Sequence, residues 1–222
     1  MDDYAEAMTF PPVMFIQEDA PCCQRSCSFY APGCRKTQYN VHAGGDANGE
    51  LLLTHSKGQS CGQSAIVACS NDGPIYCPMC CCLPYLNTNG PQGEAYGSSK
   101  YICDCCLFVP KFVIKDAAGQ NQYLVRPNTC CAGACIKCDC AGKGGKCCAI
   151  PFMIRDPTTK KPVEGAGGGQ AEIVKLWAGL AKECCGRNNY SIRYPASAPR
   201  ELRATLMGSA LLMDITLFEI KQ

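Results

Sequence analysis

Residues 199–220 read PRELRATLMGSALLMDITLFEI, and this stretch decides the fold because it carries the clearest helical period in the chain. Pro199 stands just upstream, where a proline is compatible with a helix start. Apolar and small residues then recur at intervals of three and four, which predicts a helix over 201–220 with one buried face. The residues of that face are Leu202, Leu206, Ser209, Ala210, Met213 and Leu217, of which Leu206, Ala210, Met213 and Leu217 are the core-helix candidates.

The length of this apolar stretch decides between a core helix and a membrane span. The uncharged part lies between Arg203 and Asp214 and is only about half of the roughly 20 apolar residues that a span needs. An aspartate near the bilayer midplane would cost about 2.5–3.5 kcal/mol. We therefore expect a helix buried in the protein core, with membrane insertion as the open alternative.

The body of the chain repeats one pattern three times: an alternating strand, a turn that begins with aspartate, and a return strand. The first unit covers residues 39–53 with Asp46 in its turn, the second 112–125 with Asp116, and the third 152–163 with Asp156. Each unit predicts a β-hairpin, and repeated hairpins favour an antiparallel sandwich or barrel. Residues 1–21 are expected to be an extended lead-in with a short strand near 13–16, and 22–222 one domain.

The segment that begins at Ile173 is ambiguous from its pattern alone. A helical period runs through Ile173, Leu176, Trp177, Leu180 and Cys184. Gly169 and Gly179 make a helix there less favourable.

The net charge and the cysteine content limit which classes of function fit this sequence. The net charge of +2 over 222 residues gives no strongly basic field, so we expect no nucleic-acid partner. The sequence contains 22 cysteines, often adjacent to one another, and neighbours on a strand point to opposite faces and rarely bridge. No signal peptide is evident at the start. A reducing compartment is favoured, with thiols used for acylation, metal binding or packing, and a disulfide framework is the alternative.

Three Cys-x2-Cys pairs have the spacing of zinc ligands and sit at the ends of neighbouring hairpins. The zinc candidates are Cys77, Cys80, Cys103, Cys106, Cys135 and Cys138. No activating arrangement links a cysteine to either histidine, His42 or His55, so we expect no enzymatic activity.

Five segments, in order, resemble the phospholipid scramblase family. Residues 107–114 (LFVPKFVI) are similar to the family's Leu-Pro-Lys-Phe stretch, and 130–140 to its cysteine-rich segment. The other three are 173–179 (IVKLWAG) with Glu183, 190–195 (YSIRYP), and 207–214 (MGSALLMD) with 217–219 (LFE).

This resemblance implies an antiparallel Tubby-like β-barrel closed around the hydrophobic C-terminal helix, and a strand rather than a helix at 173–179. It also implies Ca²⁺-dependent movement of phospholipids between leaflets, cysteine palmitoylation, and a plasma-membrane or mitochondrial location. Cys80, Cys81 and Cys82 are the palmitoylation candidates, and two acyl chains would anchor the chain stably.

The chain departs from the family's pattern in two places. The proline-rich N-terminal region and the opening strands of the barrel are absent, so we expect an N-terminally truncated member with exposed strand edges. Where the family has an acidic Ca²⁺ loop, the chain has Arg187, Asn188 and Asn189. Ca²⁺ prefers several oxygen ligands, commonly carboxylates, so we expect no Ca²⁺ at this degenerate loop.

Two functions follow as hypotheses. The first is a membrane-associated scramblase anchored by acylated cysteines. The second is a structural subunit of a larger, for example mitochondrial-membrane, complex that uses the barrel as a scaffold and its cysteines to hold zinc.

Overall fold

The structure is a computed structural model that describes residues 11–19, 36–58, 69–70, 73–74, 83–102, 109–130, 135–136, 150–176 and 189–218. Ten of its strands form one antiparallel sheet in which neighbours in the sheet follow each other along the chain. These strands are β1 (Met14–Asp19), β2 (Thr37–Ala43), β3 (Leu51–Lys57), β6 (Tyr85–Asn89), β7 (Ala95–Ile102), β8 (Lys111–Asp116), β9 (Asn121–Pro127), β12 (Ile150–Arg155), β13 (Glu172–Leu176) and β14 (Asn189–Arg193).

Two small antiparallel pairs stand apart from this sheet. β4 (Cys69–Ser70) pairs with β5 (Gly73–Pro74), and β10 (Thr129–Cys130) pairs with β11 (Cys135–Ile136). Near the C-terminal end of the chain, helix α4 (Arg200–Met213) continues into a π-helical segment, η4 (Asp214–Phe218). The prediction of an antiparallel sheet with one C-terminal helix is therefore confirmed.

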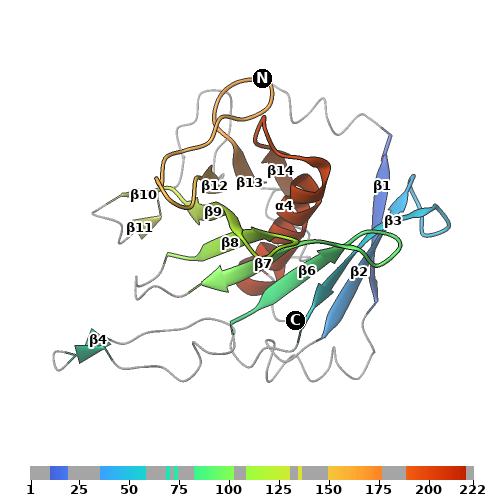
Figure 1. Cartoon of the computed structure of the whole chain (residues 1–222), viewed down its shortest axis with the longest axis horizontal. Coiled ribbons are helices and arrows are strands. Elements are labelled where there is room, and N and C mark those ends of the chain that lie inside the picture. The colour runs from blue at the N-terminus through green and yellow to red at the C-terminus, as the bar shows by residue number, and fades with distance from the viewer. Residues whose placement is uncertain are drawn as a thin grey trace.

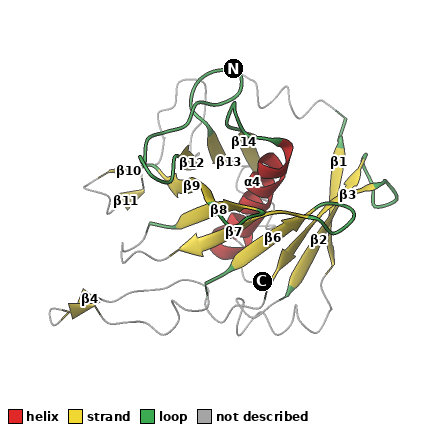
Figure 2. Cartoon of the chain, viewed as in Figure 1, coloured by secondary structure: helices red, strands yellow, loops and turns green. Residues whose placement is uncertain are grey.

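The sheet curls around α4, so that the helix lies in its concave side (Figure 1, Figure 2). Within the described part of the chain, β1 and β14 end the strand order and do not pair with each other. Closure of the sheet into a barrel is thus not seen among these residues.

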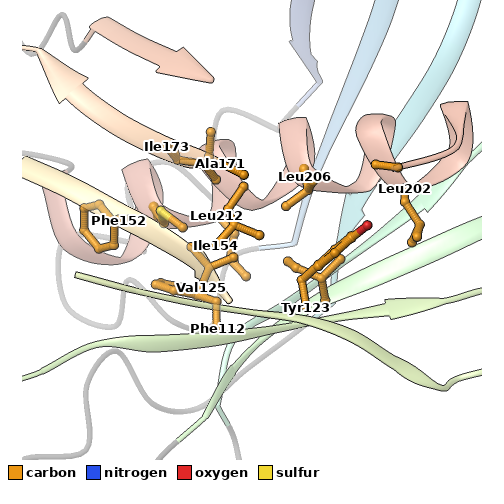
Figure 3. Packing of buried hydrophobic residues seen from close by; sticks show 14 of the residues in the cluster. Phe112, Tyr123, Val125, Phe152, Ile154, Ala171, Ile173, Leu202, Leu206 and Leu212 are labelled. Atoms are coloured by element: carbon orange, nitrogen blue, oxygen red, sulfur yellow. The ribbon is translucent and has the colours of Figure 1, made fainter. Parts of the chain in front are cut away.

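The core lies between α4 and the concave face of the sheet. The helix turns Leu206 and Leu212 toward apolar side chains of the central and later strands, among them Val125, Ile154 and Ile173 (Figure 3). The four core-helix candidates all contribute: Leu206, Ala210 and Met213 are buried, and Leu217 packs against the same cluster. A smaller cluster on the β1 side joins Val41, Leu53, Tyr96 and Ala204.

The turns that begin with aspartate owe their shape to the carboxylate. Asp46 Oδ1 accepts a hydrogen bond from the N–H of Asn48, and Asp116 Oδ1 accepts one from the N–H of Gln120. Asp156 Oδ1 accepts two, from the N–H groups of Thr158 and Thr159. In these tight turns the carboxylate oxygens accept hydrogen bonds from backbone N–H groups that lack a backbone acceptor. The same hydrogen bonds hold the pKa of Asp116 and of Asp156 below the ordinary value of an aspartate.

The first two predicted hairpins are present as β2–β3 and β8–β9. The third is shorter than predicted: Val163 donates its N–H to Ile154 O, but Pro162 makes only an isolated bridge to Arg155. Since proline has no N–H to donate, a full return strand is not formed. β12 instead pairs with β13, which shows that residues 172–176 are a strand and not a helix.

Candidate functional site

The most unusual part of the core is a row of polar side chains between α4 and strands β3, β6 and β7. His55 of β3 is fully buried, and its Nδ1 lies 3.0 Å from Oγ1 of Thr88, its register partner on β6. Burial lowers the pKa of His55 to about 4, because the charged ring would lose its hydration. The imidazole is therefore neutral at pH 7 and acts as a polar packing element beneath the helix.

The helix comes close to this ring because it has a glycine there. A Cβ at Gly208 would lie 2.7 Å from Nδ1 of His55 and 2.8 Å from Cδ2 of Leu86. One turn earlier, Thr205 lies beside Gly97 of β7 and donates its hydroxyl to Glu201 O at 2.9 Å. Small residues on one face of α4 thus let the helix lie directly on the strands.

Two further hydroxyls in the same layer are buried without a hydrogen-bond partner among the described residues: those of Ser99 on β7 and Ser209 on α4. Sequence reasoning placed Ser209 on the buried face but gave no sign of this polar layer. The signal that the sequence offers is a serine within an otherwise apolar helix face, whereas His55 lies just beyond the predicted return strand that ends at residue 53.

The second candidate feature is one end of the sheet, which we call the cysteine end. The pairing of neighbouring strands aligns one end of each strand along this side of the sheet, from β1 to β14. These strand ends are Asp19, Thr37, Lys57, Tyr85, Ile102, Lys111, Pro127, Ile150, Leu176 and Asn189. All 22 cysteines lie in the five connections that leave and re-enter the sheet at this end.

The individual cysteine predictions fall mostly outside the described residues. This holds for the palmitoylation candidates Cys80, Cys81 and Cys82 and for the zinc candidates Cys77, Cys103, Cys106 and Cys138. Cys135 is the exception, and its backbone pairs with that of Cys130 in the β10–β11 ladder. Within the described ranges, no group of three or more His, Cys, Asp or Glu residues could hold a metal ion. Acylation and zinc binding at these cysteines remain predictions.

Three lysines at the cysteine end are nearly buried, which the sequence did not reveal: Lys57, Lys111 and Lys175. Lys57 shares the core-facing side of β3 with His55, and Lys175 shares that of β13 with Ile173. Buried lysine stems cover apolar surface while their charge needs a polar neighbour. Buried lysine side chains therefore lie at or next to the strand ends from which cysteine-bearing connections leave or return.

The degenerate Ca²⁺ loop reaches the described part of the chain only at its end. Asn188 lies outside it, and Asn189 begins β14 opposite Leu176. The next residue, Tyr190, donates its hydroxyl to Asp214 Oδ1 at 3.0 Å, which ties the first residues of β14 to the end of α4. With two amides and an arginine in place of carboxylates, the donor set of 187–189 does not fit Ca²⁺.

None of the helices in the described ranges is long and apolar enough to cross a membrane.

The chain is similar in sequence to phospholipid scramblases. The chain is 24% identical over 212 residues to phospholipid scramblase 2 of Bos taurus, which covers 94% of the chain and 58% of that protein. It is also 24% identical over 211 residues to phospholipid scramblase 1 of Homo sapiens and of Mus musculus, with 93% of the chain and 53% or 51% of those proteins covered. The chain thus spans little more than half the length of these relatives. No protein-family model and no solved structure matches it.

Proposed function

We propose, from its similarity to phospholipid scramblases, that the chain is a member of that family and moves phospholipids between the leaflets of a membrane. The observation that carries this proposal is that the similarity extends along 94% of the chain rather than over one motif.

The sheet and helix support a finer proposal about architecture. A curled antiparallel meander around one apolar helix has the layout of an incomplete Tubby-like barrel, with β1 and β14 as its two terminal strands. In such a fold α4 is a core element, so lipid contact would involve the outside of the sheet or its ends.

We further propose that the cysteine end faces the membrane. The strands that flank the five cysteine-bearing connections all end at this end of the sheet, so we expect acyl chains at Cys80, Cys81 and Cys82 to emerge on that side. Two or more acyl chains give stable membrane attachment where one does not. Lys57, Lys111 and Lys175 lie at or next to strand ends from which three of these connections leave or return.

Calcium has no step in this proposal, because the residues at 187–189 offer no carboxylate. Lipid movement is a physical transfer with no bond made or broken, so the proposal needs no catalytic residue. The location is proposed to be a plasma or mitochondrial membrane, as the resemblance implies.

The function is tested with the purified full chain in vesicles that contain a trace of phospholipid labelled with a fluorescent headgroup. An added reductant that cannot cross the bilayer quenches the outer leaflet, and a scramblase makes the inner-leaflet label accessible as well. We expect accessibility in EDTA and in Ca²⁺ alike. Unchanged inner-leaflet fluorescence in both would contradict the proposal.

Acylation is tested in cells by thioester exchange and membrane fractionation. Replacement of Cys80, Cys81 and Cys82 by serine should remove acyl label and release the protein, whereas Cys147→Ser with Cys148→Ser serves as a matched control. Elemental analysis of the same samples distinguishes the scaffold hypothesis from the scramblase proposal. A chain that contains stoichiometric zinc but moves no lipid in vesicles would favour the scaffold.

A further inference from the structure

The edge of the sheet at β1 exposes an apolar run. Val13 is 73% exposed, Met14 43%, Phe15 36% and Ile16 37%, and these are the exposed large hydrophobic residues of the described chain. Because side chains alternate along a strand, Phe15 points to one face and Met14 and Ile16 to the other. The run is thus apolar on both faces of the strand that ends the sheet in the described part of the chain.

The ladder with β2 fixes which backbone groups point away from the sheet. Gly44 donates its N–H to Val13 O at 3.0 Å, and residues 13 and 44 are the next positions of the β1–β2 register after Met14 and Ala43. In an antiparallel ladder the bonded positions alternate. Val13 and Phe15 therefore bond toward β2, while Met14 and Ile16 direct their N–H and C=O groups away from it.

A lipid bilayer is a poor occupant for this edge. An open strand edge in hydrocarbon would leave its backbone polar groups without hydrogen-bond partners, which is strongly unfavourable. Acidic residues also surround the apolar run: Glu18 and Asp19 follow it, and Asp46 and Glu50 lie in the adjacent β2–β3 turn region. An anionic membrane surface would be repelled, whereas a second strand would satisfy the backbone.

We propose that β1 pairs in antiparallel orientation with β1 of a second copy of this chain, with Ile16 of each copy at the two-fold axis. In this register Met14 of one copy lies opposite Glu18 of the other, and Phe15 opposite Gln17. The apolar centre is then shared and the acidic ends Glu18 and Asp19 lie at opposite ends of the new ladder. A parallel pairing would place the acidic residues of the two copies side by side, which is unfavourable.

The central position of Ile16 provides a charge-reversal test on the full chain. In Ile16→Lys or Ile16→Glu, like charges would lie directly opposite each other at the axis, while an equimolar mixture of the two variants would pair Lys with Glu. Asn87→Lys, at an exposed position of the interior strand β6, is the matched control. Mass is measured by light scattering after gel filtration, and thermal melts check that each variant is folded.

The expected result is a wild-type mass of twice the 23.8 kDa of one chain, kept in Asn87→Lys. Each Ile16 variant alone should lose the dimer, and the mixture should restore it. A monomeric wild-type chain at tens of micromolar would overturn the proposal, and so would dimers that persist in Ile16→Lys. Binding of the wild-type monomer to neutral vesicles that is lost in Ile16→Lys would assign the edge to lipid instead.

Discussion

Replacing Gly208 with alanine tests whether α4 lies directly on the buried imidazole of His55. The new methyl group would lie 2.7 Å from Nδ1 and 2.9 Å from Cε1 of this ring, and 2.8 Å from Cδ2 of Leu86. The ring has little freedom to yield, because it is fully buried and its Nδ1 contacts Thr88 Oγ1 at 3.0 Å. The helix or the ring must therefore shift.

Two opposing effects set the magnitude. Alanine in a helix interior is favoured over glycine by about 1 kcal/mol. Overpacking a well-filled core costs about 1–3 kcal/mol, and displacing the ring from Thr88 costs about 1 kcal/mol more. The sum is a loss of about 2 kcal/mol in the free energy of unfolding, or a fall in Tm of about 4–8 °C for a chain of this size.

The assay is urea unfolding of four proteins: wild type, Gly208→Ala, His55→Ser and the double variant. Since His55→Ser removes the ring, alanine at 208 should cost less in that background, with a coupling energy of at least about 1 kcal/mol. If Gly208→Ala instead raised stability by about 1 kcal/mol in the wild-type background, as helix propensity alone predicts, the close helix–ring contact would be refuted.

Three further predictions concern the core, and one concerns calcium. Burial lowers the pKa of His55 from 6.5 to about 4, so between these pH values the unfolded chain binds a proton that the folded chain does not. The free energy of unfolding should therefore fall by roughly 3 kcal/mol as the pH drops from 6.5 to 4. Urea unfolding at several pH values should show that His55→Gln removes this part of the pH dependence. Ser209→Ala should be neutral or stabilising by up to about 1 kcal/mol, since it removes a buried hydroxyl without a partner among the described residues. Thr205→Val should lower stability by about 1 kcal/mol, because it removes a hydrogen bond to the helix backbone. Thermal melts of the two variants, measured in parallel, should show a higher Tm for Ser209→Ala. Tyr190→Phe should cost about 1–2 kcal/mol by removing the hydroxyl that donates to Asp214, and urea unfolding of Asp214→Asn, which keeps an acceptor, should show a smaller loss. Isothermal titration of the full chain with Ca²⁺ should give no saturable heat; a site with micromolar affinity would show that ligands other than 187–189 complete it.

Much of the fold could be predicted from local pattern. The helical period at 201–220 identified α4 and its buried face, because each position on that face is apolar or small. Asp46 and Asp116 marked two hairpins, since an aspartate that accepts backbone N–H groups is a local device. The β6–β7 hairpin was missed, although Asn89 and Gly90 are typical turn residues, because its strands are rich in polar residues.

What the sequence could not supply is the set of contacts between distant segments. His55 and Gly208 are separated by most of the chain, so nothing local reveals that one requires the other to lack a side chain. The burial of Lys57, Lys111 and Lys175 likewise depends on what surrounds each strand end. That the five cysteine-bearing connections all begin and end at one end of the sheet followed from alternating strand direction once the meander was known.

Transbilayer movement of a labelled phospholipid, measured in EDTA with the purified full chain in vesicles, tests the central claim most directly. The similarity to phospholipid scramblases, together with the carboxylate-free stretch at 187–189, predicts two things. The inner-leaflet label should become accessible at a rate that rises with the amount of protein, and this rate should not change when Ca²⁺ is added. Label that stays protected at every protein-to-lipid ratio, with and without Ca²⁺, would contradict the claim that this chain moves lipids.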